Sequence, residues 1–193
     1  MDSYGDLRWS CLTLPTGRKI YLTQRPDRAK YVSVWNFISE KKPSIRFCFT
    51  DDIVTDFDGA VPFLWYPWIP GEHIPTENIF AFFCLMDYYE NISLPDKSFW
   101  LHCDSSTMRA PTFLGLYLYA KWSDKAEEIC KKVTANNDNE LEMRLKHSIP
   151  TEYAQTSMKL DPGVKELIEA WQKGGEKEAY LHLMNRKTHL KLS

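Results

Sequence analysis

The sequence predicts an α/β domain whose C-terminal part is rich in helices. Two observations support this: β-rich runs fill the N-terminal part, and helical patterns dominate after the short apolar run Phe99–Leu101. Strands followed by helices around one core are typical of such domains. With 193 residues, of which 44% are hydrophobic, the chain can bury a full core. We therefore expect one domain over residues 1–193, with a helical C-terminal extension over about 150–193.

The N-terminal part is predicted to hold strands. Leu7–Leu12 and Lys19–Thr23 flank a turn at Pro15–Gly17, which predicts a β-hairpin. Tyr31–Ile38 and Ile45–Phe49 are rich in β-branched and aromatic residues, so both are predicted to be strands.

A loop and a helix are predicted next. Val61–Pro75 contains four prolines among tryptophan and tyrosine side chains, which indicates a loop with an apolar underside. The helix is expected to begin after Thr76, whose hydroxyl can cap it. Its predicted buried stripe consists of Ile79, Phe80, Phe83, Met86 and Leu85.

Phe99–Leu101 is predicted to be a central strand, because it is short and apolar and the helical pattern resumes only after residue 109. Pro111–Lys121 is predicted to be a helix, in which Pro111 is tolerated because the first turn needs no intrahelical donor. Further helices are predicted at Asp124–Val133, Glu140–Lys146, Pro162–Trp171 and Glu176–Lys187.

The overall charge excludes several kinds of partner. The 24 basic and 26 acidic residues nearly cancel, so there is no general positive field for nucleic acid or an anionic membrane. The N-terminus has no basic region followed by an apolar stretch, and the longest apolar segments are shorter than the roughly 20 residues that span a bilayer.

The five cysteines are widely spaced without paired CxxC motifs, which argues against a disulfide framework or a structural zinc site. We therefore expect a cytoplasmic protein without metal or cofactor, and its oligomeric state stays open.

The strongest chemical signal lies at residues 102–109, which read His-Cys-Asp-Ser-Ser-Thr-Met-Arg between a predicted strand and a predicted helix. A tight loop that leads into a helix points backbone N–H groups and the helix dipole at one place, which favours a bound anion and a thiolate. Arg109, six positions after Cys103, would add a planar fork that clamps two phosphate oxygens. The spacing alone also suits a buried structural cysteine and a surface arginine, but the flanking strand and helix favour the phosphate-binding interpretation. The predicted phosphate-binding residues are Asp104, Ser105, Ser106, Thr107, Met108 and Arg109.

Residues 99–119 resemble the signature region of the protein tyrosine phosphatase superfamily, above all its compact, dual-specificity-like branch. The resemblance implies a central, mainly parallel sheet flanked by helices. It implies that Cys103 is the nucleophile that forms a phosphocysteine intermediate, that Arg109 binds phosphate, and that His102 orients the loop and favours the thiolate. The implied substrate is a phosphorylated protein or small phosphomonoester: phosphotyrosine, with phosphoserine and phosphothreonine as further candidates.

The signature departs from the family pattern at two positions. The family usually has glycine where this chain has Ser106, and serine or threonine where it has Ala110. The missing hydroxyl implies slow breakdown of the intermediate. A second function is therefore kept open, a catalytically weak phosphate-binding interaction module. Hydrolysis of nucleic-acid 5′ phosphates or inositol lipids is disfavoured, because the loop holds no lysine and the chain is not basic.

The chain also departs from the family pattern at the position of the general acid. Family members place an aspartate about thirty residues before the cysteine, a role worth roughly 10²–10⁴ in rate. Trp68–Pro75 holds no aspartate, so Glu72 is the nearest substitute and His73 the next; both could equally be exposed loop groups. The nearby Trp65, Tyr66 and Trp68 could line the site, although such aromatic residues more often anchor a loop to the core.

Overall fold

The computed structural model describes residues 7–26, 31–52, 60–67, 73–104, 109–135 and 161–190. The strands are β1 (Trp9–Thr13), β2 (Lys19–Thr23), β3 (Pro43–Cys48), β4 (Phe63–Trp65), β5 (Ser98–His102) and β6 (Thr134–Ala135). The helices are α1 (Tyr31–Lys41), α2 (Thr76–Ile92), α3 (Arg109–Trp122), the short 3₁₀ helix η2 (Ser123–Lys125), α4 (Ala126–Cys130) and α6 (Val164–Leu190).

These strands form one sheet in the order β4-β3-β5-β2-β1-β6. β5 lies between β2 and β3 and is parallel to both, and β4 is parallel to β3. Only β1 runs antiparallel, to β2 and to β6. The predicted hairpin, the central strand and the mainly parallel sheet are confirmed.

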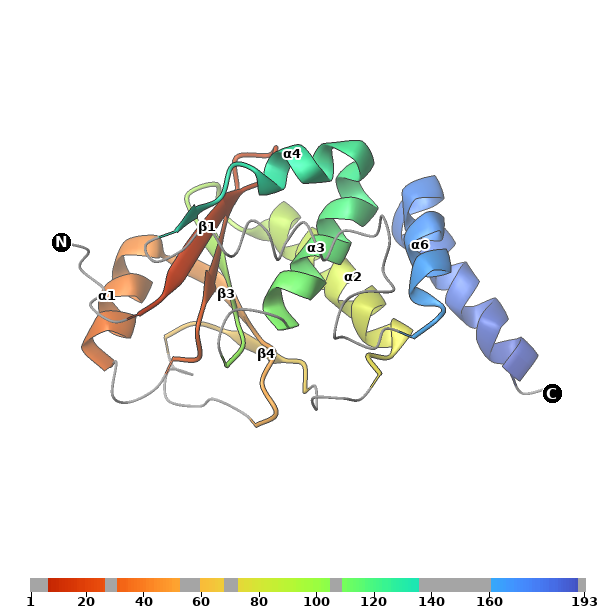
Figure 1. Ribbon diagram of the computed structural model, residues 1–193, viewed down its shortest axis with the longest axis horizontal. Coiled ribbons are helices and arrows are strands. Elements are labelled where there is room, and N and C mark those ends of the chain that lie inside the picture. Colours follow the sequence, from red (N-terminus) through yellow and green to blue (C-terminus); the bar gives the residue numbers. More distant parts are fainter. Residues whose placement is uncertain are drawn as a thin grey trace.

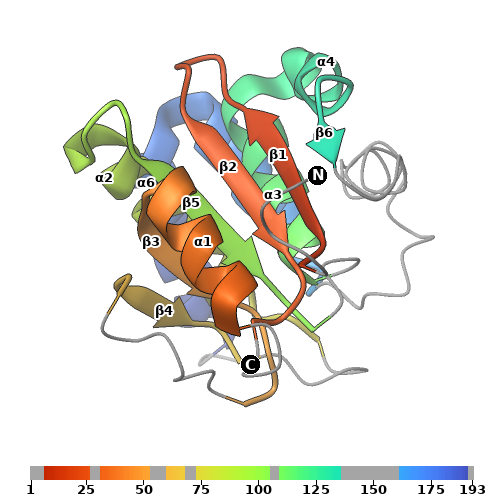
Figure 2. The same ribbon diagram turned by 90° about the vertical axis from the view of Figure 1, so that its left-hand side faces the viewer.

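Helices cover both faces of the sheet (Figures 1 and 2). α1 lies over one face, where Val34 and Phe37 pack against Tyr21 and Trp100. α2, α3 and α6 lie over the other face, where Phe82 and Phe113 join the larger hydrophobic cluster. No helix among the described residues is long and apolar enough to cross a bilayer.

The prediction of a strand at Tyr31–Ile38 is wrong, because these residues form most of helix α1. Their β-branched and aromatic side chains favour strands in general. In α1, however, Val34, Phe37 and Ile38 are the buried residues, and their spacing of three and four positions makes one helical face. Packing of that face against the sheet outweighs the intrinsic preference.

Three further details differ from the predictions. Thr76 does not cap α2: it is the first helical residue, and its buried hydroxyl instead accepts a hydrogen bond of 3.0 Å from Arg186 on α6. The predicted loop at residues 61–75 contains the short strand β4, which adds to the sheet beside β3. The helix predicted at Asp124–Val133 ends at Cys130 as α4, and the chain then forms β6.

α6 covers both C-terminal helices that the sequence predicts. It contains a break at Gly174 and Gly175, where φ reaches +65° at Gly175, a conformation that glycine adopts without steric penalty. Residues on both sides of this break, such as Trp171 and Leu183, belong to the core cluster that α2 and α3 form. The helix predicted at residues 140–146 lies outside the described residues.

Candidate active site

The predicted catalytic cysteine lies at the carboxyl end of the central strand. β5 ends at His102 and Cys103 follows directly, with 2% of its surface exposed, in the cluster that contains Ala110 and Phe113 of α3. Because β2, β3 and β5 are parallel neighbours, their carboxyl ends meet at the same edge of the sheet, where open α/β sheets commonly bind ligands. Residues 105–108, which complete the predicted phosphate-binding loop, lie outside the described residues.

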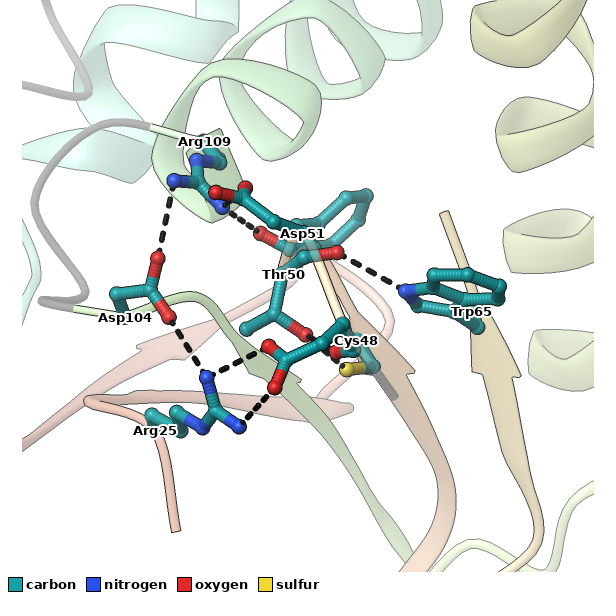
Figure 3. Close-up of polar contacts among 9 residues, drawn as sticks. Arg25, Cys48, Thr50, Asp51, Trp65, Asp104 and Arg109 are labelled. Atoms are coloured by element: carbon teal, nitrogen blue, oxygen red, sulfur yellow. Dashed lines mark hydrogen bonds and ion pairs between the residues drawn. The ribbon is translucent and has the colours of Figure 1, made fainter. Parts of the chain in front are cut away.

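Arg109 is the first residue of α3 and its guanidinium points toward the ends of β3 and β5 (Figure 3). Its Nη1 atom lies 2.6 Å from Oδ1 of Asp51 and donates a 3.1 Å hydrogen bond to the carbonyl oxygen of Phe49. Its Nη2 atom lies 2.9 Å from Oδ2 of Asp104. Only 13% of the arginine side chain is exposed. The group thus forms a nearly buried cation at the strand ends, where it compensates two carboxylates.

A second arginine, Arg25, follows strand β2 and reaches the same place. Its guanidinium makes two hydrogen bonds of 2.7 Å with the carboxylate of Asp52, and its backbone N–H donates to the carbonyl oxygen of Asp104 at 3.1 Å. Its Nη1 atom also lies 3.6 Å from Oδ1 of Asp104. The hydrogen bonds between Arg25 and Asp52 lower the pKa of Asp52 and raise that of Arg25.

These contacts form one network of alternating charges, in the order Asp52, Arg25, Asp104, Arg109 and Asp51 (Figure 3). We call it the strand-end network, since four of its members follow β2, β3 and β5, and Arg109 at the start of α3 reaches the same strand ends. The carboxylate of Asp104, directly after Cys103, lies between the two arginines. The sequence reasoning did not single out Arg25, Asp51 or Asp52. Their position immediately after predicted strands was the available signal.

The turn after β3 carries Asp51 and Asp52, and hydrogen bonds to β4 and β5 hold it in place. Trp65 of β4 donates a 2.9 Å hydrogen bond from its indole N–H to the carbonyl oxygen of Thr50, and the Thr50 hydroxyl lies 2.9 Å from Sγ of Cys48 (Figure 3). The backbone N–H of Phe49 donates to the carbonyl oxygen of His102 at 2.8 Å. Trp65 therefore helps to hold this turn, but 38% of it is exposed, and its predicted role in lining the site stays a prediction. Tyr66 anchors its segment to the core, because its buried ring stacks on Phe49.

His102 is completely buried, and neither ring nitrogen has a hydrogen-bond partner among the described residues. Its ring lies 5.7 Å from that of Trp100 between centroids. Burial, followed by the positive charges of Arg46 and Arg25, holds the pKa of His102 well below its usual value. The ring is therefore neutral at physiological pH. Its implied role in orienting the loop and favouring the Cys103 thiolate stays a prediction.

The neutral state of His102 predicts that acid destabilises the fold. The unfolded chain takes up a proton on this residue near pH 6.5, whereas the folded protein does not. The free energy of unfolding should therefore fall as the pH drops below about 6.5, by up to ~1.4 kcal/mol per pH unit from this group. Urea unfolding between pH 7.5 and pH 5 measures the effect. His102→Gln should show a shallower decline than the wild type, and parallel curves would contradict the assignment.

The predicted general acid Glu72 lies outside the described residues. His73 is exposed, at the start of the next described segment. The five cysteines form no disulfide, and Cys48 is buried. Within the described ranges, no three histidine, cysteine, aspartate or glutamate side chains lie together as metal ligands would.

In the described residues, the central strand of an α/β sheet ends directly before Cys103 and a helix begins at Arg109. Comparison with solved structures shows that this fold is shared with phosphatases of the dual-specificity and protein tyrosine phosphatase types. No protein-family model matches the chain, and no curated protein matches it by sequence.

Three solved structures illustrate the likeness. DUSP15 superposes with a TM-score of 0.51 over 90% of this chain and 94% of its own, at 10% sequence identity. A mouse putative dual specificity phosphatase, solved with zinc tungstate, gives 0.51 over 88% of this chain and 90% of its own, also at 10% identity. A putative protein tyrosine phosphatase from Leishmania major gives 0.52 over 65% of this chain and 85% of its own, at 12% identity. At these identities the likeness concerns the fold.

Proposed function

We propose that the protein is a cysteine-dependent phosphatase that hydrolyses phosphotyrosine, and also phosphoserine or phosphothreonine, in phosphorylated proteins. The main support is the position of Arg109, whose guanidinium lies at the carboxyl end of the central strand that delivers Cys103. That arrangement stands in a fold shared with dual-specificity phosphatases.

In the proposed reaction, the Cys103 thiolate attacks phosphorus while the bond to the ester oxygen breaks. The leaving oxygen takes a proton from an acid, for which Glu72 is the proposed donor. Water then attacks the phosphocysteine, which releases inorganic phosphate and regenerates the thiolate. Arg109 would hold two of the nonbridging oxygens throughout, because its planar fork matches their spacing.

A second candidate function is a phosphate-binding interaction module with little turnover. It is favoured by Ala110, a fully buried residue that offers no hydroxyl to assist departure of the thiolate. Tight, Arg109-dependent binding of a phosphopeptide with no phosphate released over hours would establish this function instead.

A pH–rate profile with an aryl phosphate tests both the reaction and the proton donor. We expect turnover with an acidic optimum in the wild type and loss of the basic limb in Glu72→Gln, because the neutral side chain cannot donate a proton. Glu77→Gln is a matched control, since Glu77 is an exposed residue on α2 whose ion pair is with Lys187. No turnover in the wild type would contradict the phosphatase function. An unchanged basic limb in Glu72→Gln would assign the donor elsewhere.

A further inference from the structure

The strand-end network carries more negative than positive charge. It contains the two arginines Arg25 and Arg109 and three aspartates, Asp51, Asp52 and Asp104, so its formal charge before any ligand binds is −1. A phosphate ester adds a further charge of about −1.5 to −2 at pH 7. A site that accepts such an anion must offset this accumulation.

Two carboxylates lie against the Arg109 guanidinium. Nη1 faces both Asp51 and the Phe49 carbonyl oxygen, and Nη2 faces Asp104. A phosphate held by two parallel N–H donors of this guanidinium would therefore bind close to both carboxylates. Asp52 lies one step further away in the network, because its two hydrogen bonds go to Arg25.

Both carboxylates are also open to solvent. Their side chains are 50% exposed for Asp51 and 44% exposed for Asp104, so both can face an incoming substrate. Two carboxylates near a bound dianion repel it unless a cation lies between them, and like-charge juxtaposition is a common source of specificity.

We propose that Asp51 and Asp104 select phosphopeptides that carry a lysine or arginine beside the phosphorylated residue. The inference rests on the proposed phosphatase function. The substrate's cation would compensate the two carboxylates when phosphate draws on the positive charge of Arg109. Additional phosphates on a substrate would be repelled by the same two carboxylates and are disfavoured.

The test compares two phosphotyrosine peptides that differ only in having lysine or glutamate on both sides of the phosphorylated residue. For the wild type at low salt, we expect kcat/KM to be about tenfold or more higher for the lysine peptide. This preference should fall about threefold in Asp51→Asn and in Asp104→Asn, and it should weaken as salt rises. Because the readout is a ratio, any general effect of these substitutions on the site cancels.

Asp124→Asn provides a charge-matched control, since Asp124 lies beyond the opposite end of α3 and should leave the ratio unchanged. Binding of both peptides to Cys103→Ser supplies a readout that needs no turnover, so failure of the phosphatase function and failure of the selectivity are distinguishable. Equal or reversed preference in the wild type would overturn the proposal. So would a preference that neither Asp51→Asn nor Asp104→Asn reduces.

Discussion

Replacing Cys103 with serine is expected to abolish phosphomonoester turnover, with a loss on the order of 10⁴-fold or more. A serine hydroxyl stays protonated at neutral pH and is a far weaker nucleophile than a thiolate. Cys103 is 2% exposed and lies beside the first turn of α3, where the smaller hydroxyl fits the same space. Phosphate binding should therefore persist, because Arg109 is untouched. Initial rates with an aryl phosphate, together with calorimetric titration of phosphate, separate the two properties.

Cys130→Ser serves as the matched control for this experiment. Cys130 is also a buried cysteine, but it ends α4, in another part of the core. The variant should retain activity close to that of the wild type, even if its stability falls. Equal rates for Cys103→Ser and the wild type would rule out the proposed nucleophile. Equal losses in the two variants would indicate a general effect of placing a hydroxyl in the core.

The central part of the fold could be predicted because its signals are local. Phe99–Leu101 is too short and apolar for an exposed element, and Pro111 marks the first turn of a helix, so the order of strand, loop and helix around Cys103 followed directly. The N-terminal hairpin has a comparable local signal in Gly17, which adopts a φ of +84° in the turn.

The features that the sequence analysis missed depend on contacts between distant segments of the chain. Helix α1 carries residues that favour strands, and only its packing on the sheet makes it helical. Arg25 and Asp51 enter the site because β2 and β3 both pair with β5, and such pairing is not visible in one sequence. The contact of Thr76 is also one between distant segments. Its hydroxyl accepts a hydrogen bond from Arg186, near the other end of the sequence, and does not cap α2 as predicted.

The two carboxylates beside Arg109 bear on its proposed role. Arg109 compensates Asp51 and Asp104, so a phosphate bound there would compete with carboxylates that the protein itself supplies. The planar guanidinium suits such an exchange, because its donors are fixed in one plane and can pass from one pair of oxygens to another without losing the charge.

Arg109→Lys is therefore expected to lower kcat/KM for an aryl phosphate by about 10³-fold and to weaken phosphate binding by about 100-fold, although the charge is kept. A lysine ammonium is a compact charge that cannot contact Asp104, Asp51 and the Phe49 carbonyl oxygen in the present geometry, nor bind two phosphate oxygens side by side. Initial rates and phosphate titration measure the two losses. Arg186→Lys is the matched control, because Arg186 also bridges an aspartate, Asp161, at 2.6 Å, but it does so from α6. If Arg109→Lys and Arg186→Lys both kept wild-type kcat/KM, the positive charge of residue 109 would suffice and bidentate phosphate recognition by Arg109 would be disproved.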